Sequence, residues 1–212
     1  MSHESREQSA RVIEKVRSLA EVLPTLDRGA KAVMLERRST RSVRPLFDCM
    51  RNTFKFNFFN LHGYNTSNVE GLKKAFAYKK ACLIQYDAAK DDVLNSYDYI
   101  FEDLMSILKH FPNYHIVYDY INFNKYKHEI QDWHCDEPEI ESHTDGAIRI
   151  VRTYIGRPTE YALDKRGTGR TALSKPGVTV HTIGNNVGAW HKAPAYDSNE
   201  VRCTVGFWLK PL

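Results

Sequence analysis

The sequence lacks the features of a disulfide-stabilised or membrane-bound protein. Its four cysteines include no C-x-x-C pair, and a disulfide framework is expected in much shorter secreted chains. No apolar run approaches the roughly 18 residues that a membrane span needs. The polar N-terminus has no apolar stretch typical of a secretory signal. We therefore expect a cytoplasmic protein with reduced thiols and no membrane partner.

The composition is that of an ordinary globular chain. Apolar residues make up 42% and charged residues 26% of 212 residues, which argues against a disordered chain and favours one domain spanning 1–212. A net charge of +4 does not by itself indicate a nucleic-acid partner. The 12 Tyr and 10 Phe favour β-rich structure, because aromatic side chains pack well on a pleated surface.

Hydrophobic periodicity predicts helices in the first half and strands in the second. Helical spacing predicts helices over 5–23, ending at Pro24, and over 92–111, started by Asp91 or Asp92. Short strand-like runs are predicted at 54–59, 83–86, 115–122, 146–155, 177–183 and 201–209. Regularly spaced short strands are typical of a sandwich or barrel. The class is therefore α+β, mainly β, with 1–114 supporting a β-rich core over 115–212.

A local His-x-Asp motif is the strongest chemical signal. In an extended segment residues i and i+2 point to the same side, so His134 and Asp136 can aim at one point while Cys135 faces away. With a third ligand from a distant strand, two histidines and one carboxylate form the ligand set of non-haem Fe(II) oxygenases. The chain has nine histidines, so the motif is weak alone. A loop histidine beside a surface aspartate is the alternative.

The C-terminal region offers the third ligand. His191 precedes Arg202 by eleven residues with a turn-prone segment between them, which predicts two antiparallel strands facing a common cavity. An arginine there suits a carboxylate, because its planar fork donates two parallel hydrogen bonds. His181 competes with His191 but has no arginine at a similar distance downstream. His143 and Asp145 lie in a segment that is typical of a solvated loop.

The order His134-x-Asp136, His191, Arg202 resembles the Fe(II)/2-oxoglutarate oxygenase superfamily, most closely its prolyl-hydroxylase-like branch. The strings at 153–161 and 175–178 agree, and the match covers roughly 115–209. The same strings are also similar to an uncharacterised bacterial family with a Trp-His-x-Asp motif.

This resemblance implies a double-stranded β-helix, or jelly-roll, with the N-terminal helices packed on it. It implies that His134, Asp136 and His191 form the catalytic Fe(II) site. It also implies that Arg202, helped by Tyr118 or Tyr120, binds the cosubstrate 2-oxoglutarate, and that O2 is consumed. An aspartate ligand leaves no place for a halide, which favours hydroxylation, or demethylation through hydroxylation.

Two other functions remain open from the sequence. A cupin-like metal protein would keep the three ligands without 2-oxoglutarate chemistry. A nucleic-acid- or protein-binding module would use the basic segment 28–55, although such a run is usually a solvated face. The loop 162–175 is interpreted either as a lid over substrate or as an exposed basic loop. The substrate, whether peptide, nucleic acid or small molecule, is not identified by the sequence.

Overall fold

The computed structural model describes residues 13–53, 69–85, 90–122, 132–136, 146–184, 188–195 and 202–212, with the backbone alone for 51–53 and 117–122. In chain order its elements are β1 (Ile13–Lys15), η1 (Leu19–Glu21), α2 (Val22–Asp27), β2 (Ala32–Glu36), α3 (Arg44–Thr53), α4 (Val69–Gln85), α5 (Asp91–Leu108), β3 (Tyr114–Asn122), β4 (Ile148–Ile155), β5 (Glu160–Ala162), β6 (Thr171–Ala172), β7 (Gly177–Thr182), β8 (Trp190–Lys192) and β9 (Cys203–Pro211).

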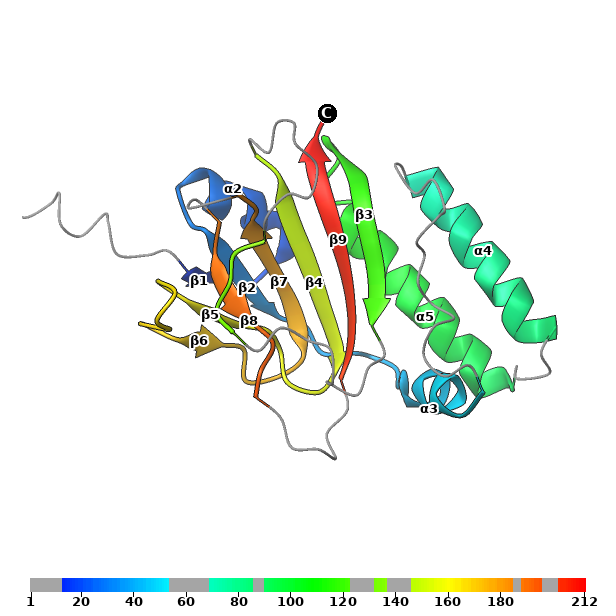
Figure 1. Cartoon of the computed structure of the whole chain (residues 1–212). Coiled ribbons are helices and arrows are strands. Elements are labelled where there is room, and N and C mark those ends of the chain that lie inside the picture. Colours follow the sequence, from blue (N-terminus) through cyan, green and yellow to red (C-terminus); the bar gives the residue numbers. More distant parts are fainter. Residues whose placement is uncertain are drawn as a thin grey trace, which may run out of the picture.

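The strands form two sheets, and helices cover one side of the larger one (Figure 1). The six-stranded sheet has the order β1-β2-β7-β4-β9-β3, and the three-stranded sheet has the order β6-β5-β8. All pairs are antiparallel except β1 with β2. The described part is thus a mixed α/β structure consistent with a β-sandwich.

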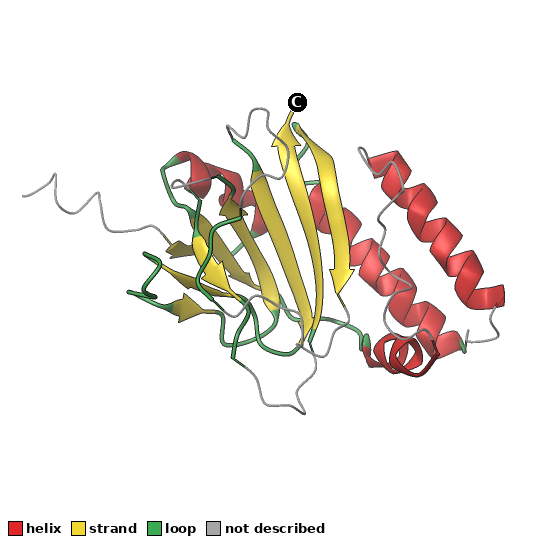
Figure 2. Ribbon diagram, in the orientation of Figure 1, coloured by secondary structure: helices red, strands yellow, loops and turns green. Residues whose placement is uncertain are grey.

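Strand alternation separates the two faces of the large sheet. Residues two apart on a strand point to the same side, so Val178 and Val180 of β7 join the main hydrophobic core with Ile100 and Leu104 of α5. Thr179 of β7 points to the opposite side, where it hydrogen bonds the three-stranded sheet. Figure 2 shows the long helices grouped on one side of the large sheet. The helix side of the sheet therefore carries the main hydrophobic core, and the side facing the small sheet combines polar side chains with a smaller apolar cluster.

A buried ion pair crosses the helix side. The side chain of Arg152 on β4 is fully buried, and its Nε donates to Asp103 Oδ2 of α5 at 2.8 Å. Its Nη1 donates to the Arg37 carbonyl at 2.7 Å, and the Arg37 side chain bonds the other oxygen of Asp103. Buried charges are tolerated when they are paired and hydrogen bonded. This cluster fixes the segment after β2 and helix α5 to the sheet.

The helix predicted over 5–23 is wrong for residues 13–18, whereas residues 19–23 are helical. The chain instead forms β1, which pairs with β2, and then η1 and the start of α2. Pro24 lies in the first turn of α2, not after its end, because a proline there removes no intrahelical hydrogen bond. Edge pairing with β2 therefore overrides local helical periodicity.

The strand predicted at 83–86 is also wrong, because 83–85 end helix α4. A short apolar run has no period of its own that separates strand from helix. The strand predicted at 54–59 lies outside the described residues.

The remaining helix and strand predictions agree with the structure over the described residues. The helix predicted over 92–111 is α5, and the runs beginning at 115, 146, 177 and 201 are β3, β4, β7 and β9. The N-cap of α5 is Lys90, not Asp91 or Asp92, but Asp92 in the first turn accepts a hydrogen bond from the Val93 backbone N at 2.9 Å. No helix in the described part has both the length and the apolar content needed to cross a membrane.

Candidate metal centre

The His-x-Asp segment is placed by backbone pairing with β8. His134 N donates to the His191 carbonyl at 3.0 Å, and His191 N donates to the His134 carbonyl at 2.8 Å. Reciprocal bonds of this kind place two residues directly opposite each other in an antiparallel ladder. The segment therefore extends the edge of the three-stranded sheet, and the two imidazole rings lie with centroids 4.4 Å apart.

Each histidine engages its Nδ1 atom with a backbone carbonyl, which leaves Nε2 to bind a ligand. His134 Nδ1 lies 2.9 Å from the Asp132 carbonyl, and His191 Nδ1 lies 2.9 Å from the Ala189 carbonyl. A carbonyl only accepts, so each Nδ1 carries the proton and each Nε2 keeps its lone pair. The buried Nε2 of His191 has no hydrogen-bond partner among the described residues. Fixing a ring through the other nitrogen is how proteins orient metal-ligating histidines.

Asp136 completes the group from the same segment. One ligand atom from each of His134, Asp136 and His191 lies within 4.8 Å of the others. Burial acts to raise the pKa of Asp136. Hydrogen bonding from His181 and the charge of Arg149 outweigh burial and hold that pKa well below its usual range. The carboxylate is therefore ionised, and the donor set fits Fe(II) or a similar divalent cation.

His181 contacts the group without belonging to it. Its Nε2 lies 2.9 Å from Asp136 Oδ2, and its Nδ1 lies 2.9 Å from the Tyr161 hydroxyl. Burial, together with the neighbouring His191, lowers the pKa of His181 to about 3. The ring is therefore neutral, with Nε2–H donating to Asp136 and Nδ1 accepting from Tyr161. The contacts from Tyr161 to His181 and from His181 to Asp136 therefore orient the carboxylate.

Arg149 is a site residue that the sequence reasoning missed. It lies on β4, opposite His181 of β7 and Trp208 of β9, and its Nη1 lies 2.6 Å from each oxygen of Asp136. Its guanidinium carbon also lies 5.9 Å from the centre of the Trp208 ring. Alternation within the run 148–155 gives a signal, since Arg149 falls on the face opposite Ile148 and Ile150.

Arg202 lies just before β9 and contacts the segment that leads into β5, the strand paired with β8. Its Nε donates to the Arg157 carbonyl at 3.0 Å, and its Nη2 donates to Thr159 Oγ1 at 2.8 Å. Thr159 precedes β5, whose Tyr161 ring lies 6.0 Å from the His191 ring. His191 and Arg202 were expected on two strands of one pair. Strands β8 and β9 instead belong to different sheets, so these two residues do not lie on one strand pair.

The predicted tyrosine helpers are placed by their backbone alone. Tyr118 pairs with Trp208, and Tyr120 pairs with Gly206, in the ladder between β3 and β9. Both therefore stay predictions as helpers of Arg202. His143 and Asp145 lie outside the described residues.

The hairpin between β5 and β6 supports the metal centre from outside. Its turn at Gly167 has a positive φ of 79°, and a Cβ added there would lie 2.5 Å from Trp133 Nε1. On another side, Lys192 Nζ lies 5.0 Å from the centre of the Trp133 ring. Trp133 directly precedes His134. This loop, suggested as a lid, therefore packs in the described structure against the residue that leads into the ligand pair.

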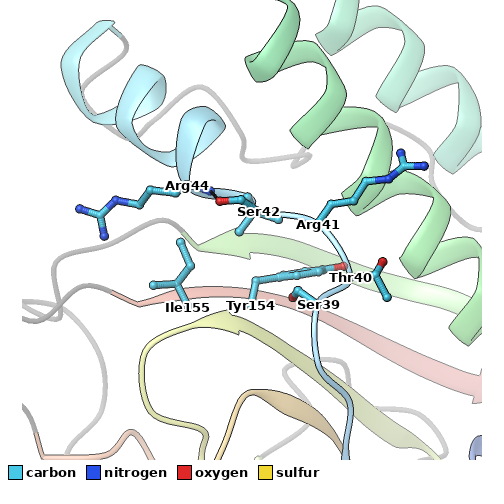
Figure 3. Close-up of a pocket in the computed structure, with 8 residues that line it drawn as sticks. Ser39, Thr40, Arg41, Ser42, Arg44, Tyr154 and Ile155 are labelled. Carbon is cyan, nitrogen blue, oxygen red and sulfur yellow. Dashed lines mark hydrogen bonds between the residues drawn. The ribbon is translucent and has the colours of Figure 1, made fainter.

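A pocket of about 390 Å³ lies elsewhere, around the start of α3 (Figure 3). None of the residues that line it carries a carboxylate or an imidazole; they are Ser39, Thr40, Arg41, Ser42, Val43, Arg44, Tyr154 and Ile155. The Arg41 and Arg44 side chains point away from each other in Figure 3, and each has an acidic partner, Glu102 at 3.8 Å and Asp48 at 3.1 Å. The pocket is thus separate from the candidate metal centre.

Comparisons with known proteins find distant likenesses among solved structures. No family model matches the sequence, and no curated protein matches it. Among solved structures, a full-length Neurospora crassa protein in complex with alpha-KG has a TM-score of 0.40 at 9% identity, covering 86% of this chain and 76% of that chain. The nickel complex of the non-heme monooxygenase ThoJ has a TM-score of 0.37 at 11% identity, covering 92% and 77%. Likenesses this distant do not place the chain in a family.

Proposed function

We propose that this chain is an Fe(II)- and 2-oxoglutarate-dependent oxygenase that hydroxylates its substrate, or demethylates it through hydroxylation. The observation that carries this proposal is the convergence of His134, Asp136 and His191 within 4.8 Å. Three protein ligands on one side leave coordination positions for other molecules, as in the two-histidine, one-carboxylate sites of non-haem iron oxygenases. The lone pairs left on both Nε2 atoms support the same assignment.

A jelly-roll core is part of the proposal, and the path of the chain supports it. From β3 onward the chain passes from the large sheet to the His134 bridge beside β8, and back to the large sheet at β4. It then enters the small sheet at β5 and β6, returns at β7, crosses again at β8 and ends in β9. Repeated crossing between two antiparallel sheets is the arrangement of double-sheet jelly rolls.

The proposed roles divide between metal and cosubstrate. His134, Asp136 and His191 would hold Fe(II), while His181 and Tyr161 keep the carboxylate oriented. Arg202 would bind the distal carboxylate of 2-oxoglutarate through its charged fork. When bound, Fe(II) with 2-oxoglutarate supplies an oxidative decarboxylation that consumes O2. The buried setting of Asp136 and His191 keeps bulk water away from this position.

A cupin-like metal protein is the second candidate, and one observation favours it. Two nitrogens of Arg202 already bond Arg157 and Thr159, as expected if this arginine only braces the turn before β5. In that case the three ligands would hold a metal, and 2-oxoglutarate would have no dedicated partner. Calorimetry with 2-oxoglutarate and Mn²⁺ separates the two, because only the oxygenase binds the 2-oxoacid.

The direct test measures succinate formed from 2-oxoglutarate by the Fe(II)-loaded protein in air. Wild-type protein should form succinate, whereas His134→Ala and Asp136→Ala should form none above a protein-free control. An exposed histidine, His110, gives the matched control His110→Ala, which should behave as wild type. Succinate formation that is unchanged in both ligand variants would refute the assignment.

A further inference from the structure

The three-stranded sheet carries a row of charged side chains on the face opposite its metal-binding histidine. In the ladder between β5 and β8, Tyr161 pairs with His191, and Glu160 pairs with Lys192. Tyr161 points toward the large sheet, where its hydroxyl bonds Thr179, and its ring lies 6.0 Å from the His191 ring. Neighbouring residues of a strand point to opposite faces. Glu160 and Lys192 therefore lie on the outer face of the small sheet, which is the sheet on the side away from the long helices in Figure 1.

Lys192 connects this outer row to the His-x-Asp segment. The antiparallel bridge between His134 and His191 brings Trp133, the residue before one ligand, beside Lys192, the residue after the other. Lys192 Nζ lies 5.0 Å from the centre of the Trp133 ring, a distance at which an ammonium group is attracted to the face of an indole. A lysine on a sheet surface usually extends its charged end into water, yet this side chain is only 17% exposed. Its contacts with neighbouring side chains therefore determine where it lies.

Glu160 is the charged partner of Lys192. Its Oε2 lies 3.7 Å from Lys192 Nζ, and its Oε1 accepts a hydrogen bond from Arg170 Nη2 at 2.6 Å. The Glu160 side chain is only 6% exposed, and a buried carboxylate needs cationic or hydrogen-bonding partners. Oε2 has no hydrogen-bond partner among the described residues, so Lys192 is the cation that compensates this oxygen. Lys192 is thus held between a carboxylate on β5 and an indole ring beside the metal ligands.

We propose that Lys192, fixed by Glu160, is a positioning residue for the metal centre, because it holds Trp133 and so keeps His134 opposite His191 before a metal binds. The segment that carries His134 forms an isolated bridge and not a strand, so two backbone hydrogen bonds and the contacts of Trp133 fix it. Ligands that are already in place lose less freedom on binding, which favours affinity. The inference rests on the metal site of the proposed function and does not require the oxygenase reaction.

The sign of one substitution separates positioning from simple electrostatics. Lys192 is a positive charge directly after a metal ligand, and removing it at fixed geometry favours a bound cation. Losing a contact that positions a ligand has the opposite effect. Lys192→Met removes the charge and keeps an unbranched side chain, so positioning predicts weaker metal binding and electrostatics alone predicts tighter binding.

The test is a calorimetric titration of the metal-free full chain with Mn²⁺. Lys192→Met should bind Mn²⁺ about tenfold more weakly than wild type, as for residues that orient a ligand. Lys192→Arg should stay within about threefold of wild type, because a guanidinium also pairs with a carboxylate and lies over an aromatic ring. Glu160→Gln should weaken binding by about threefold, because Lys192 keeps its charge and its ring contact. Lys73→Met, at an exposed ion pair on α4, is the control and should bind as wild type.

A double-mutant cycle shows whether Lys192 acts through Trp133. Trp133→Leu alone should weaken Mn²⁺ binding by about tenfold. Adding Lys192→Met to Trp133→Leu should weaken it by less than about twofold further, because the contact between the two side chains is already lost. If Lys192 only supports the pairing of β8 with β5, the two effects multiply instead. Circular dichroism checks that each variant is folded, and Glu160→Gln replaces Lys192→Met in the cycle if the latter does not fold.

Three results would overturn the inference. They are unchanged or tighter Mn²⁺ binding in Lys192→Met, binding in Lys192→Arg that is as weak as in Lys192→Met, and effects that multiply in the cycle with Trp133→Leu. Absence of Mn²⁺ binding by the wild type would refute both this inference and the proposed function. Positioning by Lys192 in a protein that forms no succinate would refute the oxygenase reaction alone.

Discussion

Two arginines on β4, three residues apart, each pair with a buried aspartate on opposite faces of the large sheet. Arg152 meets Asp103 on the helix side, where its side chain is fully buried and Arg37 bonds the same carboxylate. Arg149 meets Asp136 on the inner side, beside a histidine nitrogen with no hydrogen-bond partner among the described residues. The pair of Arg152 with Asp103 is hydrogen bonded by its protein neighbours and stabilises the fold. The second leaves a histidine nitrogen for a ligand, and so belongs to the candidate site.

The largest expected effect is on stability, from Asp103→Ala. Removing this carboxylate leaves Arg152 charged and buried without its partner, which should lower the free energy of unfolding by about 3–5 kcal/mol. Urea denaturation followed by circular dichroism measures this. Asp98→Ala is the matched control, since its pair with Lys80 is partly exposed and should contribute less than about 1 kcal/mol. Equal losses in the two variants would contradict the comparison.

Asp136→Ala should affect metal binding more than stability. Loss of a direct ligand should weaken Mn²⁺ binding by more than about 100-fold, beyond the range seen for outer-shell residues. The loss of stability should be smaller than for Asp103→Ala, because Arg149 is partly exposed and can be solvated. Asp48→Ala, at an exposed ion pair, should leave Mn²⁺ affinity unchanged. Calorimetry that finds wild-type affinity in Asp136→Ala would rule out this metal centre.

His181→Gln should weaken Mn²⁺ binding by about 10–100-fold, because the carboxylate loses a partner that orients it. Tyr161→Phe should also weaken Mn²⁺ binding, but by less, since it removes only the hydrogen bond between Tyr161 and His181. The exposed His110 gives the control His110→Gln. If His181→Gln binds Mn²⁺ as the wild type does, Asp136 does not depend on His181 for its orientation.

Gly167→Ala tests the outer support of the metal centre. The new methyl group would lie against the Trp133 indole, so we expect a several-fold loss of Mn²⁺ affinity as His134 shifts. Gly29→Ala is the matched control, because Gly29 also has a positive φ but no atom within 4 Å of an added Cβ. Both variants carry backbone strain, and only Gly167→Ala should change metal affinity. A similar change in both would show that strain alone is responsible.

The smallest expected effect is a difference in thiol reactivity between the two faces. Burial raises the pKa of Cys203, on the helix side, to about 12, so it remains an unreactive thiol at pH 8. Cys135, between the two ligands of the motif, is only half-buried. Iodoacetamide with peptide mapping should label Cys135 in the native protein, and Cys203 only after unfolding. If Cys203 were labelled before Cys135, the helix side would not be the more tightly buried of the two faces.

Local patterns in the sequence were sufficient for the longest elements and for the ligand candidates. The apolar stripe of α5 and the alternation of β4, β7 and β9 persist over enough residues to define a period. Short apolar runs were less predictable. Residues 13–15 form a strand through pairing with β2, and 83–85 belong to a helix, because a few apolar residues fit either period.

By itself, the sequence determined which side chains can bind a metal: the spacing of His134 and Asp136, and a later histidine followed by an arginine. Only the tertiary structure decided how they meet. Pairing of the His134 segment with β8 brings residues 57 positions apart in the sequence into one ladder, and stacking of the two sheets adds His181 and Arg149 to the same carboxylate. The physical reason is that residue type and local period specify each strand, whereas long-range hydrogen bonds and burial specify which strands face one another.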